Sequence, residues 1–156
     1  MELRKYYDPL DREWVAIWVD SEAVAEDFCG LSQVTDRMFE DWLSARDQLQ
    51  FMLNSDNGES VAYGEIWLDS DGFEVEFAHL IVSNEARGEG FGATMLRLLT
   101  DHVKKKMKKV RRILVRNEQE NVAAAGALQK ALFTKLAPIP EDWSDEYDWY
   151  YIDLDR

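Results

Sequence analysis

The sequence predicts a mixed α/β fold in which an antiparallel meander of strands leads into a β-α-β unit. Short apolar runs between residues 51 and 82 alternate with turns rich in Asn, Asp and Gly, which is typical of antiparallel strands. A strand ending at Val82, a helix from Phe91 and a strand at Ile113–Val115 then follow at short spacing, as in a parallel crossover unit. A chain of 156 residues can bury its own core, so we expect a single domain over residues 1–156.

The first part of the chain predicts a short strand followed by two helices. Leu3–Tyr7 forms the strand, and Asp8 and Pro9 start a helix as its N-cap and first helical residue. One face of this helix carries three apolar residues, namely Trp14, Ile17 and Trp18. The second helix is expected over Thr35–Arg46, with apolar residues spaced for burial at Met38, Phe39, Trp42 and Leu43. We expect both helices to border the binding groove.

The meander and the elements after it follow from turn residues and apolar spacing. Its strands are expected at Phe51–Leu53, Val61–Leu68 and Phe73–Val82. The next helix runs from Phe91 to Lys109 with its lysines outward, and its apolar residues recur every three or four positions at Met95, Leu96, Leu99, Val103, Met107 and Val110. After the strand at 113–115, we expect a helix over Asn121–Lys135 and an aromatic final strand over Tyr147–Leu154.

The net charge of −13 is distributed very unevenly. Residues 87–116 carry ten Lys/Arg and two Asp/Glu, which leaves eight basic and 29 acidic residues, a net charge of −21, in the other 126 positions. Such a field repels nucleic acid and anionic membranes and favours cationic small molecules or basic peptides. The alternative is an acidity that only keeps the protein soluble. We expect no nucleic-acid partner and no membrane partner.

Cysteine and histidine are scarce. Cys29 is the only cysteine, so no internal disulfide can form, and we expect an inert thiol because no activating partner is evident in the sequence. Two isolated histidines and one cysteine make no recognised metal site, so we expect no metal. The sequence shows neither a signal peptide nor an apolar run of membrane length, and a cytoplasmic location is the simplest interpretation. A homodimer is compatible with the sequence.

The most informative segment is the glycine-rich turn between a strand and a helix at Arg87–Ala93. Gly88, Gly90 and Gly92 stand at alternate positions, so backbone N–H groups can approach an anion without obstruction by side chains. The helix adds unpaired N–H groups and its positive dipole end, and Arg87 adds a charged donor. The turn predicts a pyrophosphate site, although similar turns also open ordinary helices. Its spacing is not Gly-x-Gly-x-x-Gly, which argues against a nicotinamide or flavin domain.

The strand Glu74–Val82, the turn Arg87–Gly92 and the helix opening at Asn121 together resemble the GCN5-related N-acetyltransferase (GNAT) superfamily over residues 60–136. The resemblance implies a GNAT-like acyl-CoA N-acyltransferase fold with acetyl-CoA as the acyl donor. It implies that the turn wraps the coenzyme A pyrophosphate, and that the end of the strand before it polarises the acetyl carbonyl through main-chain groups. The residues it assigns to the donor are Leu80, Ile81, Val82, Arg87, Gly88, Glu89, Gly90, Phe91, Gly92, Ala93 and Asn121. An ordinary core strand is the alternative for residues 80–82.

Downstream of the turn, the sequence departs from the family pattern. Asn121, with Asn117 as the alternative, and Phe133 fit the pattern. Leu128 stands where the family carries a tyrosine that protonates the departing thiolate, and leucine cannot donate a proton. The candidates to replace this tyrosine lie in the final strand and are Tyr147, Tyr150 and Tyr151.

Transfer to an amine needs a base, because an amine is protonated near neutral pH and must lose a proton before it attacks a thioester. Glu74 and Glu76 are the candidate catalytic residues, since they share one strand face at positions where the family carries a glutamate or histidine base. A solvated strand face is the alternative for both. His79 lies on the opposite pleat unless a bulge reorients it, so a structural role is expected.

The basic segment Lys104–Arg112 has two interpretations. Its cations complement the C-terminal dipole of the preceding helix and need no ligand, or they bind the 3′-phosphate of coenzyme A.

The sequence therefore predicts an acetyl-CoA-dependent N-acetyltransferase. By direct attack with a carboxylate general base, it would acetylate a primary amine of a cationic small molecule or a peptide N-terminus. The alternative is a catalytically weak or inactive acyl-CoA-binding or interaction module with the same fold, which Leu128 suggests.

Overall fold

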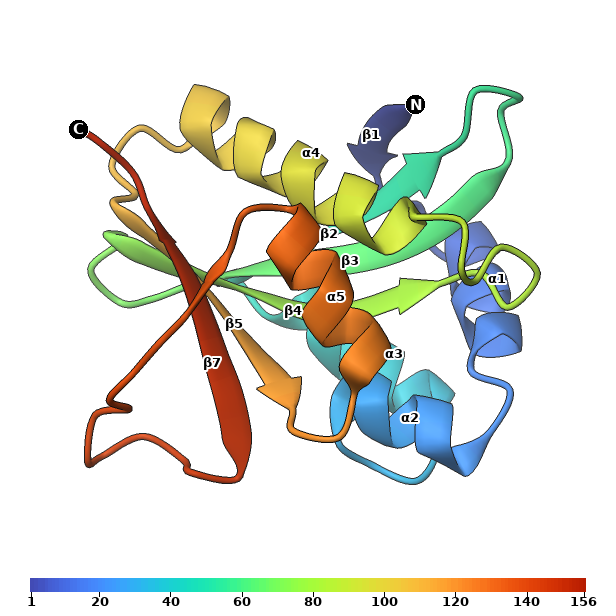
Figure 1. Cartoon of the computed structure of the whole chain (residues 1–156). Helices are drawn as coiled ribbons and strands as arrows, with labels where there is room; N and C mark the ends of the chain where they lie inside the picture. Colours follow the sequence, from blue (N-terminus) through green and yellow to red (C-terminus); the bar gives the residue numbers. More distant parts are fainter.

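The structure, a computed structural model, describes residues 1–156. It contains a seven-stranded mixed sheet with helices on both faces. The strands lie in the order β1-β2-β3-β4-β5-β7-β6 (Figure 1). Their bounds are β1 Glu2–Lys5, β2 Gln48–Asn54, β3 Ser60–Leu68, β4 Glu74–Val82, β5 Arg112–Glu118, β6 Thr134–Lys135 and β7 Tyr147–Asp153. The helices are α1 Leu10–Trp18, α2 Glu22–Cys29, α3 Asp36–Ser44, α4 Phe91–Lys106 and α5 Val122–Lys130. The predicted mixed α/β fold, with its antiparallel meander and β-α-β unit, is confirmed.

Each face of the sheet has its own core. α4 and α5 cover one face (Figure 1), where Leu99 and Leu128 belong to the larger cluster of buried apolar residues. α1, α2 and α3 cover the other face, where Phe28 and Phe39 belong to a second, smaller cluster. Because successive residues of a strand point to opposite faces, the central strands supply both clusters.

A bulge in β4 reverses the side-chain alternation of this strand. Val75 and Phe77 pack in the α4–α5 core, and strict alternation would send Ile81 to the same face. Ile81 instead packs in the core under α1–α3. The β3–β4 register shifts at Gly64, which faces two residues of β4, 79 and 80, where other positions of β3 face one. The bulge therefore re-aims every side chain in the last part of β4.

β4 and β5 separate early. They pair over only three positions, from Glu74–Arg112 to Glu76–Leu114, and then diverge (Figure 1). β4 stays paired with β3 on its other side as far as Val82, and β5 stays paired with β7 as far as Glu118. The β5-facing edge of residues 77–82 consequently has no strand partner, and a gap opens in the middle of the sheet.

The start and buried face of α1 differ from the prediction. Pro9 rather than Asp8 is the N-cap, and no side chain caps this helix. Trp18 is buried, whereas Trp14 and Ile17 are 47% and 58% exposed. The buried residues of α1 are Asp11, Val15 and Trp18, so only Trp18 of the three predicted apolar residues packs inward.

A buried carboxylate explains how α1 is oriented. Asp11 is only 1% exposed and accepts two hydrogen bonds of 2.8 Å from the Arg4 guanidinium and one of 2.7 Å from the Tyr7 N–H. Arg4 also donates to Asn54 and Ser60, at the adjoining ends of β2 and β3. The ion pair thus fastens α1 to three strands and turns the polar side of its first turn inward.

α2 was not predicted, although both of its ends carry sequence signals. Ser21 caps the helix by accepting a hydrogen bond from the Val24 N–H, and Gly30 ends it with a φ of 78°. Ala25 and Phe28 are its buried residues. The helix is short, and its buried stripe of two residues gives a weak periodic signal.

α4 and α5 end earlier than predicted. α4 ends at Lys106 rather than Lys109, and α5 ends at Lys130 rather than Lys135. Residues 134–135 form β6 and pair with β7, so the predicted last turn of α5 is replaced by a strand.

We expect Asp11→Asn to lower the free energy of unfolding at pH 7 by about 3 kcal/mol, because it leaves the half-buried Arg4 without its partner. Urea denaturation would measure the loss. The matched control is Asp41→Asn, which removes a surface pair with Arg37 and should cost less than about 0.5 kcal/mol. Equal losses in the two variants would contradict this role of Asp11.

The pH dependence of stability gives a second readout. Burial raises the pKa of Asp11, but the hydrogen bonds from Arg4 and the Tyr7 N–H lower it by more, so the folded-state pKa lies below its ordinary value. The stabilisation should be complete above the unfolded-state pKa of about 4 and fall as the pH drops through the lower folded-state value. Asp11→Asn should lack this part of the acid-induced loss.

Candidate active site

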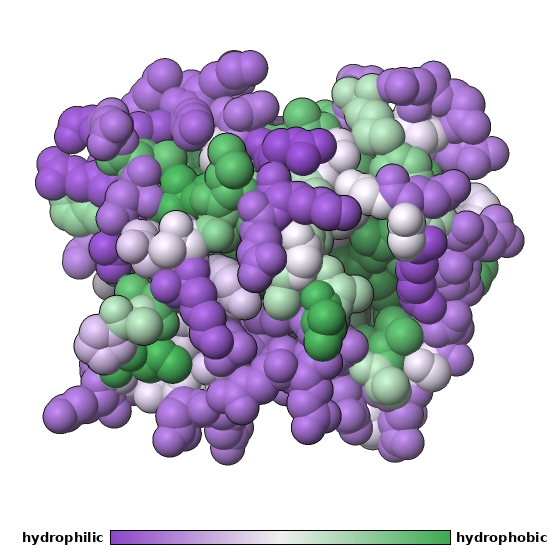
Figure 2. All heavy atoms as spheres, in the orientation of Figure 1, coloured by the Kyte–Doolittle hydropathy of each residue, from purple (hydrophilic) through white to green (hydrophobic).

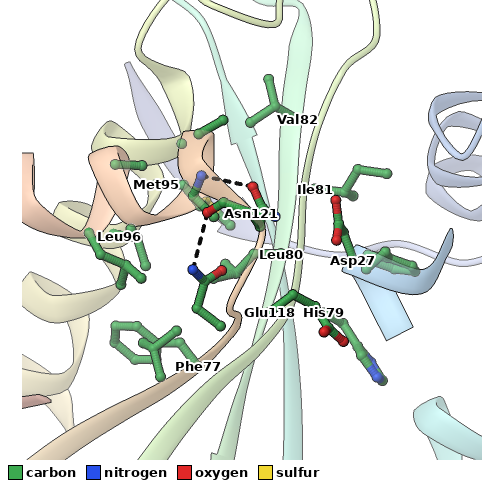
Figure 3. A pocket seen from close by; sticks show the side chains of 18 of the residues that line it. Asp27, Phe77, His79, Leu80, Ile81, Val82, Met95, Leu96, Glu118 and Asn121 are labelled. Carbon is green, nitrogen blue, oxygen red and sulfur yellow. Dashed lines mark hydrogen bonds between the residues drawn. The ribbon is translucent and has the colours of Figure 1, made fainter. Parts of the chain in front are cut away.

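A cleft of about 740 Å³ lies where β4 and β5 diverge, and its lining comes from both faces of the sheet. α4 and α5 line one side of it, which we call the α4–α5 side, and α2 lines the other, the α2 side. In Figure 3, Met95 and Leu96 lie on one side of β4, while Ile81 and Asp27 lie on the other. Figure 2 shows a hollow with an apolar floor and a hydrophilic rim to the right of α5. The gap in the sheet thus joins two differently built surfaces.

The glycine turn meets the cleft at the N-terminus of α4. Gly88 and Gly90 have φ values of 84° and 87°, in the left-handed region that other residues adopt only with strain. Gly90 is the N-cap of α4 and has no side chain to cap the first N–H groups. α2, α3 and α5, by contrast, are capped by Ser21, Thr35 and Asn121. Uncapped N–H groups of a helix that opens on a cleft suit an anion.

Most residues predicted to contact the acyl donor line this cleft. They are Leu80, Ile81, Val82, Arg87, Gly88, Gly90, Phe91, Gly92, Ala93 and Asn121. Glu89 is exposed and does not line it. The Arg87 guanidinium contacts the end of α1, where it donates to the carbonyl oxygen of Trp18 at 2.6 Å and to the carboxylate of Asp20 at 3.2 Å. Arg87 therefore fastens the turn to α1.

Asn121, rather than Asn117, opens α5. Its Oδ1 accepts a hydrogen bond of 3.0 Å from the Ala124 N–H, and its carbonyl oxygen accepts one of 3.2 Å from Nδ2 of Asn117 (Figure 3). Asn117 is buried on β5. The two asparagines together fix the start of α5 against the end of β5.

The two predicted catalytic carboxylates lie in different surroundings. Glu76 lines the cleft, and both of its oxygens accept hydrogen bonds from Arg116, at 2.7 and 2.8 Å. Glu74 does not line the cleft; it lines a smaller hollow near the start of β4, which Glu76 also lines. The structure therefore does not bring both carboxylates to the cleft.

His79 lies in the bulge of β4, with a φ of 49°. The bulge reorients it, and the ring packs on the α2 side against Phe28, Trp42 and Trp67 with centroid distances of 5.4, 4.2 and 5.0 Å. Its Nδ1 lies 2.8 Å from Oε2 of Glu65, a fully buried carboxylate on β3. His79 also lines the cleft. The sequence analysis stated that a bulge would reorient His79, but it did not predict Glu65 as its partner.

Of the three candidate tyrosines, Tyr147 alone lines the cleft. Tyr150 is 4% exposed in the α4–α5 core, and Tyr151 lies under the guanidinium of Arg112. Leu128 is buried in the same core and leaves α5 without a hydroxyl at that position. Among these three candidates, Tyr147 is therefore the one placed to donate a proton within the cleft.

An acidic group on the α2 side was missed by sequence reasoning. Glu26 and Asp27 on α2 and Glu118 at the end of β5 all line the cleft. Burial raises the pKa of Asp27. Burial, followed by repulsion from Asp27 and Glu26, raises the pKa of Glu118. These carboxylates come from distant parts of the sequence, and their crowding favours a positively charged ligand.

The lysine run lies away from the glycine turn. Lys104, Lys105 and Lys106 are in the last turn of α4, and the glycine turn precedes its first. A helix of 16 residues is about 24 Å long. None of these lysines lines the cleft. Their position matches the interpretation as helix-end cations, and the alternative role at a 3′-phosphate has no support in this geometry.

Cys29 lies in the wall of the cleft on the α2 side. Burial raises the pKa of its thiol, and Sγ donates a hydrogen bond to the carbonyl oxygen of Ala25. The thiol is therefore not activated as a nucleophile.

No group of three His, Cys, Asp or Glu side chains is arranged to hold a metal ion. No helix has both the length and the apolar character needed to cross a membrane.

Comparison with known proteins shows the family. The chain matches the model of the acetyltransferase (GNAT) family over residues 7–133, so it belongs to this family. No curated protein sequence matches it. Similar solved structures include the spermidine N-acetyltransferase of Vibrio cholerae in complex with CoA and spermine, with a TM-score of 0.76 and 15% identity over 97% of this chain and 94% of that chain. The aminoglycoside acetyltransferase AAC(6')-Ib in complex with coenzyme A and kanamycin has a TM-score of 0.76 and 16% identity over 97% of this chain and 93% of that chain.

The positive φ values in the glycine turn predict how substitutions there change the stability of the protein. Gly88→Ala and Gly90→Ala should each lower the free energy of unfolding by about 1 kcal/mol, because alanine is strained at these positive φ values. Gly92→Ala is the control: its Cβ would make ordinary contacts with Ala127 and Val82 at 3.6 and 3.8 Å. It should leave stability unchanged or raise it by up to about 1 kcal/mol, because alanine is favoured over glycine in a helix. Denaturation in urea measures all three, and a larger loss for Gly92→Ala would contradict this description of the turn.

Proposed function

We propose that this protein is an acetyl-CoA-dependent N-acetyltransferase whose acceptor is a primary amine of a cationic small molecule or a peptide N-terminus. The observation that carries the proposal is the gap between β4 and β5. It joins an uncapped helix N-terminus and glycine turn to an acidic surface on the opposite face of the sheet.

The α4–α5 side has the features that an acyl-CoA needs. The free N–H groups of α4 and the open backbone at Gly88 and Gly90 would bind the pyrophosphate. Small residues of α5, including Ala123, Ala124 and Ala127, line the same side and leave room for an extended arm. The solved complexes of similar fold contain CoA, which supports this choice of donor.

The free edge of β4 offers main-chain groups that could polarise the thioester carbonyl of the donor. Residues 80–82 have no strand partner towards β5, so their main-chain groups on that edge are available to the ligand. A backbone N–H aimed at the thioester oxygen would stabilise the negative charge that develops there during attack.

The α2 side has the charge that an amine acceptor needs. Asp27 and Glu118 would attract an ammonium group and hold it near the gap. The two similar structures are complexes with spermine and with kanamycin, both cationic amines, which supports an acceptor of this class. Attack from the α2 side on a donor held from the α4–α5 side is a direct transfer, without an acetylated protein side chain.

The proton steps need one acceptor and one donor. The assignment of the base to Glu74 or Glu76 stays a prediction, which Glu74→Gln and Glu76→Gln would test through kcat. Since Leu128 carries no acidic proton, the thiolate would take its proton from Tyr147 or from water.

The first experiment is calorimetric binding of acetyl-CoA to wild-type protein and to Gly90→Glu. The substitution places a carboxylate at the proposed pyrophosphate site and should abolish binding. Gly58→Glu is the matched control, because Gly58 has a similar φ of 84° but lies in the β2–β3 turn, outside the cleft. Wild-type protein that does not bind acetyl-CoA, or binding that survives in Gly90→Glu, would contradict the proposed donor site.

Transfer itself is tested by incubation with acetyl-CoA and a panel of polyamines, aminoglycosides and peptides, with acetylated product detected by mass spectrometry. Product with release of free thiol is the expected result. Acetyl-CoA binding without transfer to any amine would favour the alternative, a non-catalytic acyl-CoA-binding module, for which the missing α5 hydroxyl at Leu128 is the supporting observation.

For an accepted amine, Glu118→Gln should raise KM about threefold to tenfold and leave acetyl-CoA affinity unchanged, because one attractive charge is removed at a partly solvated site. Glu59→Gln, in the β2–β3 turn, is the control for net charge. Because the pKa of Glu118 is raised, KM of the wild-type protein should also increase as the pH falls through that pKa. An unchanged KM in Glu118→Gln would exclude this residue from amine binding.

A further inference from the structure

We propose that His79 accepts the proton of the acceptor amine and that the buried Glu65 is the positioning residue that prepares it. The proposal rests on the proposed function, because it names the base of that reaction. It assigns this role to a side chain on the α2 side of the gap, where the amine would enter.

Glu65 fixes the protonation pattern of the imidazole. Its carboxylate is 0% exposed and accepts hydrogen bonds from the Tyr63 hydroxyl at 2.6 Å and from Nε1 of Trp67 at 2.7 Å. The third partner is Nδ1 of His79 at 2.8 Å. An ionised carboxylate can only accept, and both neighbouring partners donate to it, so Nδ1 is the nitrogen that carries the hydrogen. The lone pair that can take a proton is then on Nε2.

The other nitrogen is unpaired and is not sealed inside the protein. Nε2 of His79 makes no hydrogen bond, yet it is not among the buried polar atoms that lack a partner, so it keeps contact with open space. The side chain is 10% exposed, and His79 lines the cleft. Buried side-chain nitrogens usually have a hydrogen-bond partner, so an unpaired nitrogen with access to open space is available to a ligand. The pattern here, with one nitrogen anchored and the other open, is that of a positioned base.

The surroundings hold the ring in one orientation. Phe28, Trp42 and Trp67 enclose it from α2, α3 and β3. The backbone at His79 has a positive φ, which a non-glycine residue adopts at a cost, and the bulge keeps it there. Without the bulge, the side chain would point into the α4–α5 core with Val75 and Phe77. The bulge thus places the imidazole on the α2 side, and the positive φ at His79 is the conformational cost of this placement.

The competing carboxylates are less suited to this step. Both oxygens of Glu76 are bound by Arg116, and Glu74 lies outside the cleft. Tyr63 donates to the same carboxylate, Glu65, and two further titratable residues, Asp27 and Cys29 on α2, line the cleft together with His79.

The reaction balances with His79 in this role. Nε2 of His79 takes one proton from the ammonium group of the acceptor. The lone pair of the resulting amine nitrogen then attacks the thioester carbonyl carbon. The C–N bond forms and the C–S bond breaks. The leaving thiolate gains a proton from Tyr147 or from water. The substrate nitrogen loses its second proton, which restores the proton that this donor gave up. The imidazolium releases the first proton to solvent, so one proton is produced for each amide and free thiol.

Kinetics with an accepted amine form the first test. His79→Gln should lower kcat by about 100-fold or more, with acetyl-CoA binding by calorimetry unchanged, and should remove the part of the pH–rate profile that reports loss of the His79 proton. His102→Gln is the matched control, since His102 lies on α4 outside the cleft and should keep full activity. Full kcat in His79→Gln would overturn the assignment of His79 as the base. A loss of kcat in Glu76→Gln with none in His79→Gln would overturn it as well.

The positioning role of Glu65 has a readout that does not depend on turnover. The chain has two histidines, so the spectrum of ¹⁵N-histidine-labelled protein can be assigned with His102→Gln. We expect His79 to carry its hydrogen on Nδ1 in wild-type protein, and Glu65→Gln to lose this preference and about tenfold or more in kcat. A wild-type spectrum with the hydrogen on Nε2 would overturn the role of Glu65 even if Glu65→Gln fails to fold.

The outcomes separate the two proposals. Wild-type protein that acetylates no amine would overturn the proposed function and the role of His79 together. Active wild-type protein with an equally active His79→Gln variant would overturn the role of His79 alone.

Discussion

The early separation of β4 and β5 is the constraint on which the rest of the site depends. Two parallel strands that stayed paired beyond Glu76 and Leu114 would close the sheet and divide the cleft into two unconnected surfaces. Their divergence leaves the β5-facing main-chain groups of residues 80–82 without strand partners, and these residues line the cleft. Under the proposed function, the acyl donor would hydrogen-bond to these main-chain groups.

The bulge beside this gap decides which side chains reach it. Gly64 permits the bulge, because a Cβ there would lie 2.7 Å from Cδ2 of Leu80 and 3.2 Å from Cε of Met95. Leu80 can then pack towards α4 while His79 turns to the α2 side. One missing side chain on β3 and one extra residue on β4 therefore give the two faces of the sheet different chemistry within a single strand.

Local signals in the sequence were sufficient for much of this arrangement. The meander, the crossover helix and the glycine turn each depend on contiguous residues, and their predicted positions agree with the structure to within a few residues. What the sequence did not reveal depends on contacts between distant residues. Glu65 and His79 meet only through the β3–β4 register, and Asp27 meets Glu118 only once α2 packs beside the end of β5. The inward Asp11 was missed because its partner, Arg4, lies on another element.

Hydrogen exchange of the backbone amides, with and without acetyl-CoA, tests the central claim most directly, because it reports where on the chain the donor binds. A donor held at the gap should slow exchange at residues 80–82 and 88–93, the free strand edge and the N-terminus of α4. Exchange in the lysine-rich end of α4, at 104–106, should not change. Protection at 104–106 with none at 80–82 or 88–93 would place the donor elsewhere and contradict the account.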